Sequence, residues 1–170
     1  LFLSKEGSAI CRRHELGKIN QQIWASDFMS RWGYFVDILY RTINSIINVF
    51  SVKTVSGDII FSSSDFWPDS FPALILKMRN PEIIWIAGFY LFAPKPWEKY
   101  SPYRGKNFLT GFLYWIGQLP TYYFIKKFAD IVFVTSQPDV DPFITNIRPK
   151  ERVIVIRGGV DTVSAKHYLN

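Results

Sequence analysis

Cysteine is nearly absent from this 170-residue chain, and its scarcity excludes two kinds of stabilisation. Because Cys11 is the single cysteine, no disulfide can form within the chain and no cysteine cluster can hold a zinc ion. The two histidines, His14 and His167, have neither metal-ligand spacing nor a neighbouring nucleophile. We therefore expect no metal site. The lack of a disulfide framework favours a cytoplasmic protein.

Motifs that mark nucleotide, phosphate or acyl-transfer sites are missing as well. The chain contains no Gly-x-Gly-x-x-Gly sequence, no P-loop and no nucleophile elbow, so we expect no cofactor to bind this chain by itself. We also expect no signal peptide, because the charged residues Lys5, Glu6 and Arg12 follow the first apolar residues too closely.

Positive charge and aromatic side chains, in contrast, are both abundant. The formal net charge is +6, and Phe, Trp and Tyr make up 18% of the residues. A nucleic-acid site would need its Lys and Arg residues concentrated between stacking aromatics, whereas here the cations are scattered and the aromatics lie in apolar runs. A membrane surface fits better, because Trp and Tyr favour the headgroup level and cations attract anionic lipid. We expect no nucleic-acid partner and an association with a membrane surface.

Short β-branched runs alternate with helical patterns along the chain, which is typical of an α/β fold with a parallel sheet. Strands are predicted at 1–4, 19–25, 58–64, 82–87, 130–136 and 152–157, and helices at 7–15, 30–49, 71–78, 108–128 and 140–147. We expect residues 1–163 to form one Rossmann-like domain, with a doubly wound, mostly parallel sheet and helices on both faces. Because the chain opens inside an apolar run, we also expect a further strand upstream.

Residues 108–125 are 18 residues without a charge, flanked by Lys106 and Lys126. That length reaches the threshold for a membrane span, but a crossing here would place the strands before and after it on opposite sides of the bilayer. Two alternatives remain: a crossover helix buried in the fold, and a helix that packs one face on the sheet and dips an aromatic face into lipid. In the second case the residues expected to contact the membrane are Phe112, Trp115, Tyr122, Lys126 and Lys127.

Candidate site residues follow the predicted strands, because in an open α/β sheet the ligand lies beyond the carboxyl ends of the strands. Small residues there let a sugar or phosphate approach the backbone, and hydroxyls and carboxylates can bind sugar hydroxyls. The residues expected to bind a hydroxylated ligand are Ser63, Ser64, Asp65, Trp67, Gly88, Phe89, Tyr90 and Ser136. Those expected at a phosphate or at a cleft towards a second domain are Arg157, Gly158, Gly159 and Asp161.

Several of these residues also have a purely structural interpretation. Asp65 and Asp69 can cap the helix that follows their strand, and Ser136 can cap the helix predicted at 140–147. Arg157 can form a surface ion pair instead of binding a phosphate, and the two glycines after it can simply free the backbone to turn. The sequence leaves these alternatives open.

Two closing motifs carry a family resemblance. The strand Asp130-Ile-Val-Phe-Val-Thr-Ser136 precedes Arg152-Val-Ile-Val-Ile-Arg-Gly-Gly-Val-Asp161, and this order and spacing resemble the end of the N-terminal domain of GT-B glycosyltransferases of the family-4-like branch. The similarity extends back through Glu82-Ile-Ile-Trp-Ile86 to Asp58-Ile-Ile-Phe61. One position departs from the pattern, since many members carry a histidine where this chain has Gly88.

The resemblance implies the acceptor-binding half of an enzyme that moves a sugar from a nucleotide-sugar to a sugar or lipid-linked acceptor, with retention of configuration. Residues 164–170 would begin a linker to a C-terminal domain, which would hold the donor. The chain alone is then expected to bind the acceptor through the hydroxylated-ligand residues but not to transfer sugar. The alternative is a non-catalytic interaction or membrane-recruiting subunit of a split transferase.

Overall fold

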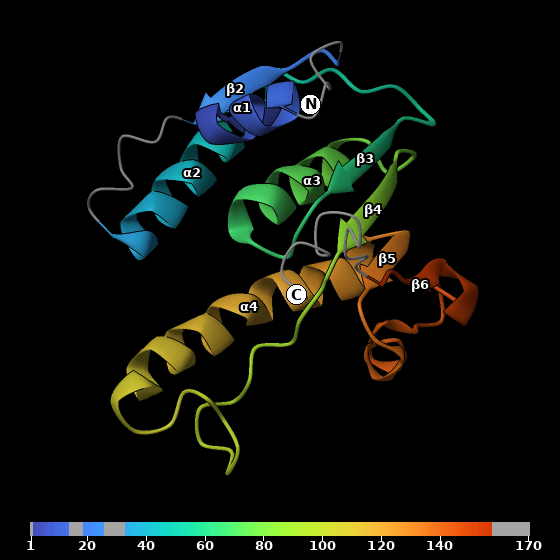
Figure 1. Ribbon diagram of the computed structural model, residues 1–170. Helices are drawn as coiled ribbons and strands as arrows, with labels where there is room; N and C mark the ends of the chain where they lie inside the picture. The colour runs from blue at the N-terminus through green and yellow to red at the C-terminus, as the bar shows by residue number, and fades with distance from the viewer. Residues whose placement is uncertain (1, 14–18, 26–32, 158–170) are drawn as a thin grey trace, which may run out of the picture.

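An α/β architecture is present in the computed structural model, which describes residues 2–13, 19–25 and 33–157 (Figure 1). Its strands are β1 (Phe2–Ser4), β2 (Gln22–Ala25), β3 (Ile59–Ser62), β4 (Ile84–Gly88), β5 (Ile131–Val134) and β6 (Val153–Val155). Its α-helices are α1 (Lys5–Arg13), α2 (Tyr34–Val49), α3 (Trp67–Arg79) and α4 (Phe108–Phe128). Short 3-10 turns are η3 (Gly105–Asn107), η4 (Gln137–Asp139), η5 (Asp141–Phe143) and η6 (Lys150–Arg152).

The main sheet contains four parallel strands in the order β3-β4-β5-β6. Its register pairs Ser62 with Ala87 and Gly88 with Phe133, so the carboxyl ends of β3, β4 and β5 lie along one edge. The segments that follow these strands are therefore brought together there, as the sequence predicts. The strands β1 and β2 form a separate parallel pair, so the single sheet that we expected is divided in two within the described residues.

One face of the main sheet is covered by α3 and α4. Side chains of β4, β5 and β6 that point to this face meet the inner sides of both helices, and burial of each large apolar side chain stabilises the fold by about 1.5–3 kcal/mol. The resulting core consists of Ala73, Leu74, Trp85, Ala87, Phe89, Ile125, Ala129, Val132, Val134, Val140, Phe143 and Val153.

The opposite face of the main sheet is also apolar, but it stays exposed. Ile59 and Phe61 are 64% and 54% exposed, and their partners across the sheet are Ile84 and Ile86. The rings of Phe61 and Phe133 lie on this face with centroids 5.8 Å apart. Parallel sheets are normally covered on both faces. The predicted second layer of helices is not found within residues 2–13, 19–25 and 33–157.

Helix α2 lies beside α3 rather than on the main sheet (Figure 1). It buries Thr42, Ser45 and Val49. The two hydroxyls donate to carbonyls of the helix itself, which allows these small polar side chains to be buried at the contact. The apolar residues that recur at spacings of three and four along this helix are largely exposed, at Phe35, Leu39, Ile43, Ile47 and Phe50.

Two helices differ from their predicted boundaries. The helix expected at 71–78 begins four residues earlier, at Trp67, because Pro68 lies in the first turn, where a missing N–H is tolerated. The helix expected at 140–147 is wrong. The described chain forms only the 3-10 turn η5 there, and it leaves helical geometry at Ile144, whose backbone is extended.

Candidate functional site

A pocket of about 550 Å³ opens beyond the carboxyl end of β3. Four segments form its walls: the first turns of α2, the junction between β3 and α3, the connection from β4 to α4, and the first half of α4. Its apolar walls include Phe35, Ile38, Leu39, Phe66, Trp67, Leu91 and Leu113. Its polar side chains include Asp65, Gln118, Tyr34, Tyr103 and Tyr114. A concave, mostly apolar site with a few convergent polar groups is the usual form of a small-molecule site.

Asp65 supplies the buried carboxylate of this pocket. It lies three residues after the end of β3 and is only 9% exposed. Burial raises the pKa of its carboxyl above the ordinary value of 3.8; the hydrogen bond from Gln118 opposes this shift and the nearby Asp69 adds to it. A carboxylate with a raised pKa accepts a proton more readily, so it is suited to bind a ligand hydroxyl or to take its proton.

Two tyrosines from different helices stand near this carboxylate. Partial desolvation raises the pKa of the phenols of Tyr34 on α2 and Tyr114 on α4, and the negative charge of Asp65 raises both further. Both phenols therefore stay protonated at neutral pH and can donate hydrogen bonds. A carboxylate acceptor between two O–H donors can bind a hydroxyl group, which is itself both donor and acceptor.

Gln118 of α4 fixes the position of Asp65. Its side-chain Nε2 donates to Asp65 Oδ2 and to the carbonyl of Leu91, both at 2.7 Å, and its Oε1 accepts from the N–H of Ala93, also at 2.7 Å. One buried amide thus joins α4, the β3–α3 junction and the segment after β4. Trp67 makes a second link to α4, because its Nε1 donates to the carbonyl of Gly117 at 2.7 Å.

The predicted serines lie at the same sheet edge, but their hydroxyls are engaged by Asp69 in the first turn of α3. Ser63 and Ser64 donate to Asp69 Oδ2 at 2.7 and 2.6 Å. Asp69 therefore closes the turn between strand and helix through these hydroxyls, whereas the cap predicted for it is not found, since the N-cap of α3 has no side-chain hydrogen bond. Asp65 makes no side-chain cap in the described chain, since the N-cap residue of α3 is Phe66 and the Asp65 carboxylate bonds to Gln118.

Three predicted ligand contacts after β4 have different surroundings. Gly88 lies beneath the phenol of Tyr90, and a Cβ at this position would come within 2.8 Å of that ring and 2.9 Å of the Ser63 carbonyl. Gly88 and Tyr90 therefore join the serines at the sheet edge. Phe89 points the other way and is 1% exposed, packed against Phe92 in the core. Its side chain has a packing role, so the predicted ligand contact is wrong for it.

The last predicted residues lie farther along the sheet. Ser136 follows β5 and donates its hydroxyl to Asp139 in η4 at 2.5 Å, so it closes a turn. Arg157 is exposed two residues after β6. Neither lines the pocket that contains Asp65. Gly158, Gly159 and Asp161, and the linker predicted at 164–170, lie outside the described residues.

The residues of α4 predicted to contact lipid are partly covered. Trp115 packs edge-on against Trp97 with centroids 4.9 Å apart, and Phe112 stacks near it. Tyr122 packs against Phe89 and Phe143 at the edge of the core. Lys126 lies over the Tyr122 ring, whereas Lys127 is exposed. The apolar face of α4 that is exposed consists instead of Leu109, Leu113, Ile116 and Tyr123.

The connection from β4 to α4 runs alongside the first half of the helix before it turns back into it (Figure 1). Its tip combines Trp97 with Tyr100, which is 89% exposed. Exposed cations follow at Lys99, Arg104 and Lys106. Aromatic rings beside cations are the composition of a lipid-headgroup contact.

Among the described residues, α4 included, no helix combines the length and apolar character that a membrane crossing needs.

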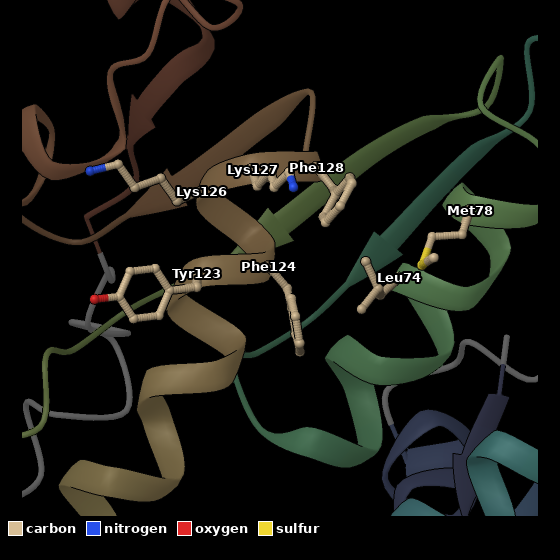
Figure 2. Close-up of a pocket in the computed structure, with 7 residues that line it drawn as sticks. All are labelled: Leu74, Met78, Tyr123, Phe124, Lys126, Lys127 and Phe128. Carbon is tan, nitrogen blue, oxygen red and sulfur yellow. The ribbon is translucent and has the colours of Figure 1, made fainter.

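A second hollow, of about 500 Å³, lies between α3 and α4. Figure 2 shows Leu74 and Met78 of α3 facing Phe124 and Phe128 of α4, while Lys126 points away. The hollow lies away from the strand ends and offers no carboxylate. We therefore place the candidate site at Asp65.

Sequence reasoning missed Gln118 and the two tyrosines of the pocket. Gln118 is the one uncharged amide in an otherwise apolar and aromatic stretch, and a buried amide needs partners, so its isolation was a usable signal. Tyr34 and Tyr114 lie 80 residues apart in the sequence, and nothing in the sequence places them together.

No group of three His, Cys, Asp or Glu side chains that could hold a metal lies within the described ranges.

A comparison of the chain with models of protein families, with curated proteins and with solved structures found no match.

Proposed function

We propose that this chain is the acceptor-binding half of a glycosyltransferase that works at a membrane surface. The observation that carries the proposal is the buried Asp65 in an apolar pocket at the carboxyl ends of parallel strands, with phenols beside it. A buried carboxylate with a raised pKa in a cleft is a candidate for binding or proton transfer. In this role Asp65 receives the acceptor hydroxyl, and Tyr34 and Tyr114 donate hydrogen bonds to the same group.

The fold and the resemblance of the closing motifs support the sugar-transfer part of the proposal. The four-stranded parallel sheet is the arrangement that half of a GT-B enzyme needs, with its ligand edge beyond β3 and β4. In this proposal a C-terminal domain binds the nucleotide-sugar, and Arg157 lies on the side of the sheet that faces it. The main sheet is then part of a larger doubly wound sheet, whose additional helices cover its exposed apolar face.

The membrane part rests on the surface around the start of α4. Lys106 lies three residues before the exposed Leu109, and Lys99 lies over the ring of the exposed Tyr100 in the same connection, so aromatic, cationic and aliphatic groups occur together in the segment that leads into α4. We expect binding to anionic vesicles that weakens as salt is raised, because salt screens the attraction between cations and lipid phosphates.

The test uses the full-length gene product, which the proposal expects to include the donor-binding domain. Radiolabelled sugar should pass from a UDP-, GDP- or ADP-sugar to a lipid extract of the host, and Asp65→Asn should lower kcat/KM by about 100-fold or more. Asp141→Asn, at an exposed carboxylate of η5, is the matched control. Unchanged transfer by Asp65→Asn, or transfer by the 170-residue chain alone, would contradict the proposal.

A second candidate is a non-catalytic, membrane-recruiting subunit of a split transferase. The exposed apolar face of the main sheet favours it, since such a face in a parallel sheet needs a covering partner. In that case transfer would require a separate polypeptide, and Asp65→Asn would change neither kcat nor KM of the complex.

A further inference from the structure

We propose that the acceptor is an amphiphile, with its hydroxylated head at Asp65 and one hydrocarbon chain in the pocket between α2 and α4. This inference rests on the acceptor-binding function proposed above and names the class of acceptor. The pocket, the burial of its polar groups and the surface around it each support the inference.

Polarity in the pocket increases with depth. Asp65 and Gln118 are both buried, whereas Phe35 and Leu39 on the α2 side are 52% and 53% exposed. Leu113 on the α4 side is also exposed. Sites for free sugars need polar partners on every side, because an unpaired buried hydroxyl is costly. A deep polar end with an apolar entrance suits a molecule with one polar end and one apolar end.

The apolar surface does not stop at the entrance. It continues onto Val36 of α2 and onto Leu109 and Ile116 of α4, all of them exposed. These exposed apolar side chains lie on the two helices whose residues line opposite sides of the pocket, so a hydrocarbon chain leaving Asp65 meets apolar surface on both. Leu109 lies in the first turn of α4, directly after the connection that carries the exposed Tyr100 and Lys106. An acceptor held in a bilayer could therefore enter the pocket from the lipid side.

The test measures binding of methyl, hexyl and octyl β-glucosides to the 170-residue chain, below their micelle concentrations, by calorimetry, with a Trp67→Phe variant to identify the part of the tryptophan fluorescence change that comes from the pocket wall. Affinity should rise about fourfold for each added methylene, because each one is removed from water. Leu39→Ser and Leu113→Ser should each reduce this chain-length dependence. Ile47→Ser, two turns from Leu39 and also exposed, is the matched control and should leave it unchanged.

Leu39, Leu113 and Ile47 are exposed, so the three variants are expected to fold, which circular dichroism checks. A dissociation constant that does not depend on chain length would overturn the inference. So would a dependence that Leu39→Ser and Ile47→Ser reduce equally, since the chain would then bind the surface and not the pocket.

Failure of this inference is distinguishable from failure of the proposed function. If the full-length gene product transfers sugar equally well to methyl and octyl glucosides, the transferase proposal stands and the inference that the acceptor is an amphiphile is wrong. If chain-length-dependent binding is found but no nucleotide-sugar is used, the pocket assignment stands and the transferase proposal is wrong.

Discussion

Asp65 and Gln118 are coupled through one hydrogen bond, and the titration of Asp65 should be visible in the stability of the whole chain. Because burial raises the folded pKa of Asp65, the folded protein binds its proton more tightly than the unfolded chain does. Between the ordinary pKa of 3.8 and the raised value, the free energy of unfolding therefore falls as pH rises, and this loss persists at neutral pH.

Asp65→Asn should remove that loss, since an asparagine oxygen can still accept from Gln118 and carries no charge. We expect the variant to gain stability relative to the wild type as pH is raised from about 4 to about 7, measured by urea unfolding. Asp141→Asn controls for the loss of one carboxylate at an exposed site. A constant difference between Asp65→Asn and wild type across this range would show that Asp65 titrates equally in both states.

Arg148 illustrates a buried charge with a structural role. It is 1% exposed, and its guanidinium donates to the carbonyls of Phe143, Ile125, Ala129 and Lys126. Three of these carbonyls belong to the end of α4, where orphan acceptors and the helix dipole both favour a cation. Burial lowers the pKa of Arg148 to about 10, so it stays charged at neutral pH.

Arg148→Met keeps the length and apolar stem of the side chain but removes its hydrogen bonds to the four carbonyls, of which that of Ile125 still accepts from the N–H of Ala129. We expect a loss of about 3–5 kcal/mol in the free energy of unfolding, measured by chemical denaturation. Arg152→Met, at an exposed position of η6, should change stability by less than about 0.5 kcal/mol. Equal effects of the two substitutions would mean that the buried hydrogen bonds contribute nothing.

At the scale of elements, helix α4 contains two glycines, Gly111 and Gly117, whose surroundings differ. Substitution of each by alanine would show how much helix propensity and side-chain packing contribute to stability. A Cβ at Gly111 would lie 2.2 Å from the Cβ of Tyr103, so this glycine lets the β4–α4 connection lie directly on the helix. A Cβ at Gly117 would meet only Trp67 Cζ2, at 3.9 Å. The same substitution should therefore have opposite effects at the two positions.

Gly117→Ala should raise stability by about 0.5–1 kcal/mol, because alanine favours the helix and the space is free. Gly111→Ala should lower stability and move the connection away from α4, because the added methyl would lie 2.2 Å from Cβ and 2.4 Å from Cγ of Tyr103, and a Cβ moves only with its backbone. Thermal unfolding measures both, and hydrogen exchange of residues 95–107 reports the displacement. Stabilisation by both alanines would show that the connection does not depend on this contact.

The positions of the predicted strands and helices are largely confirmed, whereas the way in which they pack on one another could not be predicted. Strand and helix positions follow local composition, so the runs at Ile59–Ser62 and Ile131–Val134 were found at once. Periodicity shows that α2 is amphipathic but not which neighbour covers it, and its apolar stripe is largely exposed in the described chain. The same limit applies to the site. Asp65 was predicted from its place after a strand, but its contact with Gln118 spans 53 residues and depends on the tertiary fold.

For the whole molecule, the main question is how a four-stranded parallel sheet remains half covered. Ile59, Phe61, Ile84 and Ile154 are all exposed on one side of it, and these side chains belong to all the strands but β5. An open apolar face of this kind is normally a contact surface for another layer. The chain by itself should therefore bind apolar dyes and associate with itself.

Phe61→Thr and Ile59→Thr should weaken both properties with little effect on folding. Each side chain is more than half exposed, so its removal loses little burial energy, and threonine retains the β-branched preference for a strand. We expect lower fluorescence of a bound apolar dye and a shift towards monomer in analytical ultracentrifugation. The matched control is Phe66→Thr, also exposed but outside the sheet, in the junction before α3. If Phe66→Thr lowers the dye signal as much as Phe61→Thr does, the pocket and not the sheet face is the main apolar surface of the molecule.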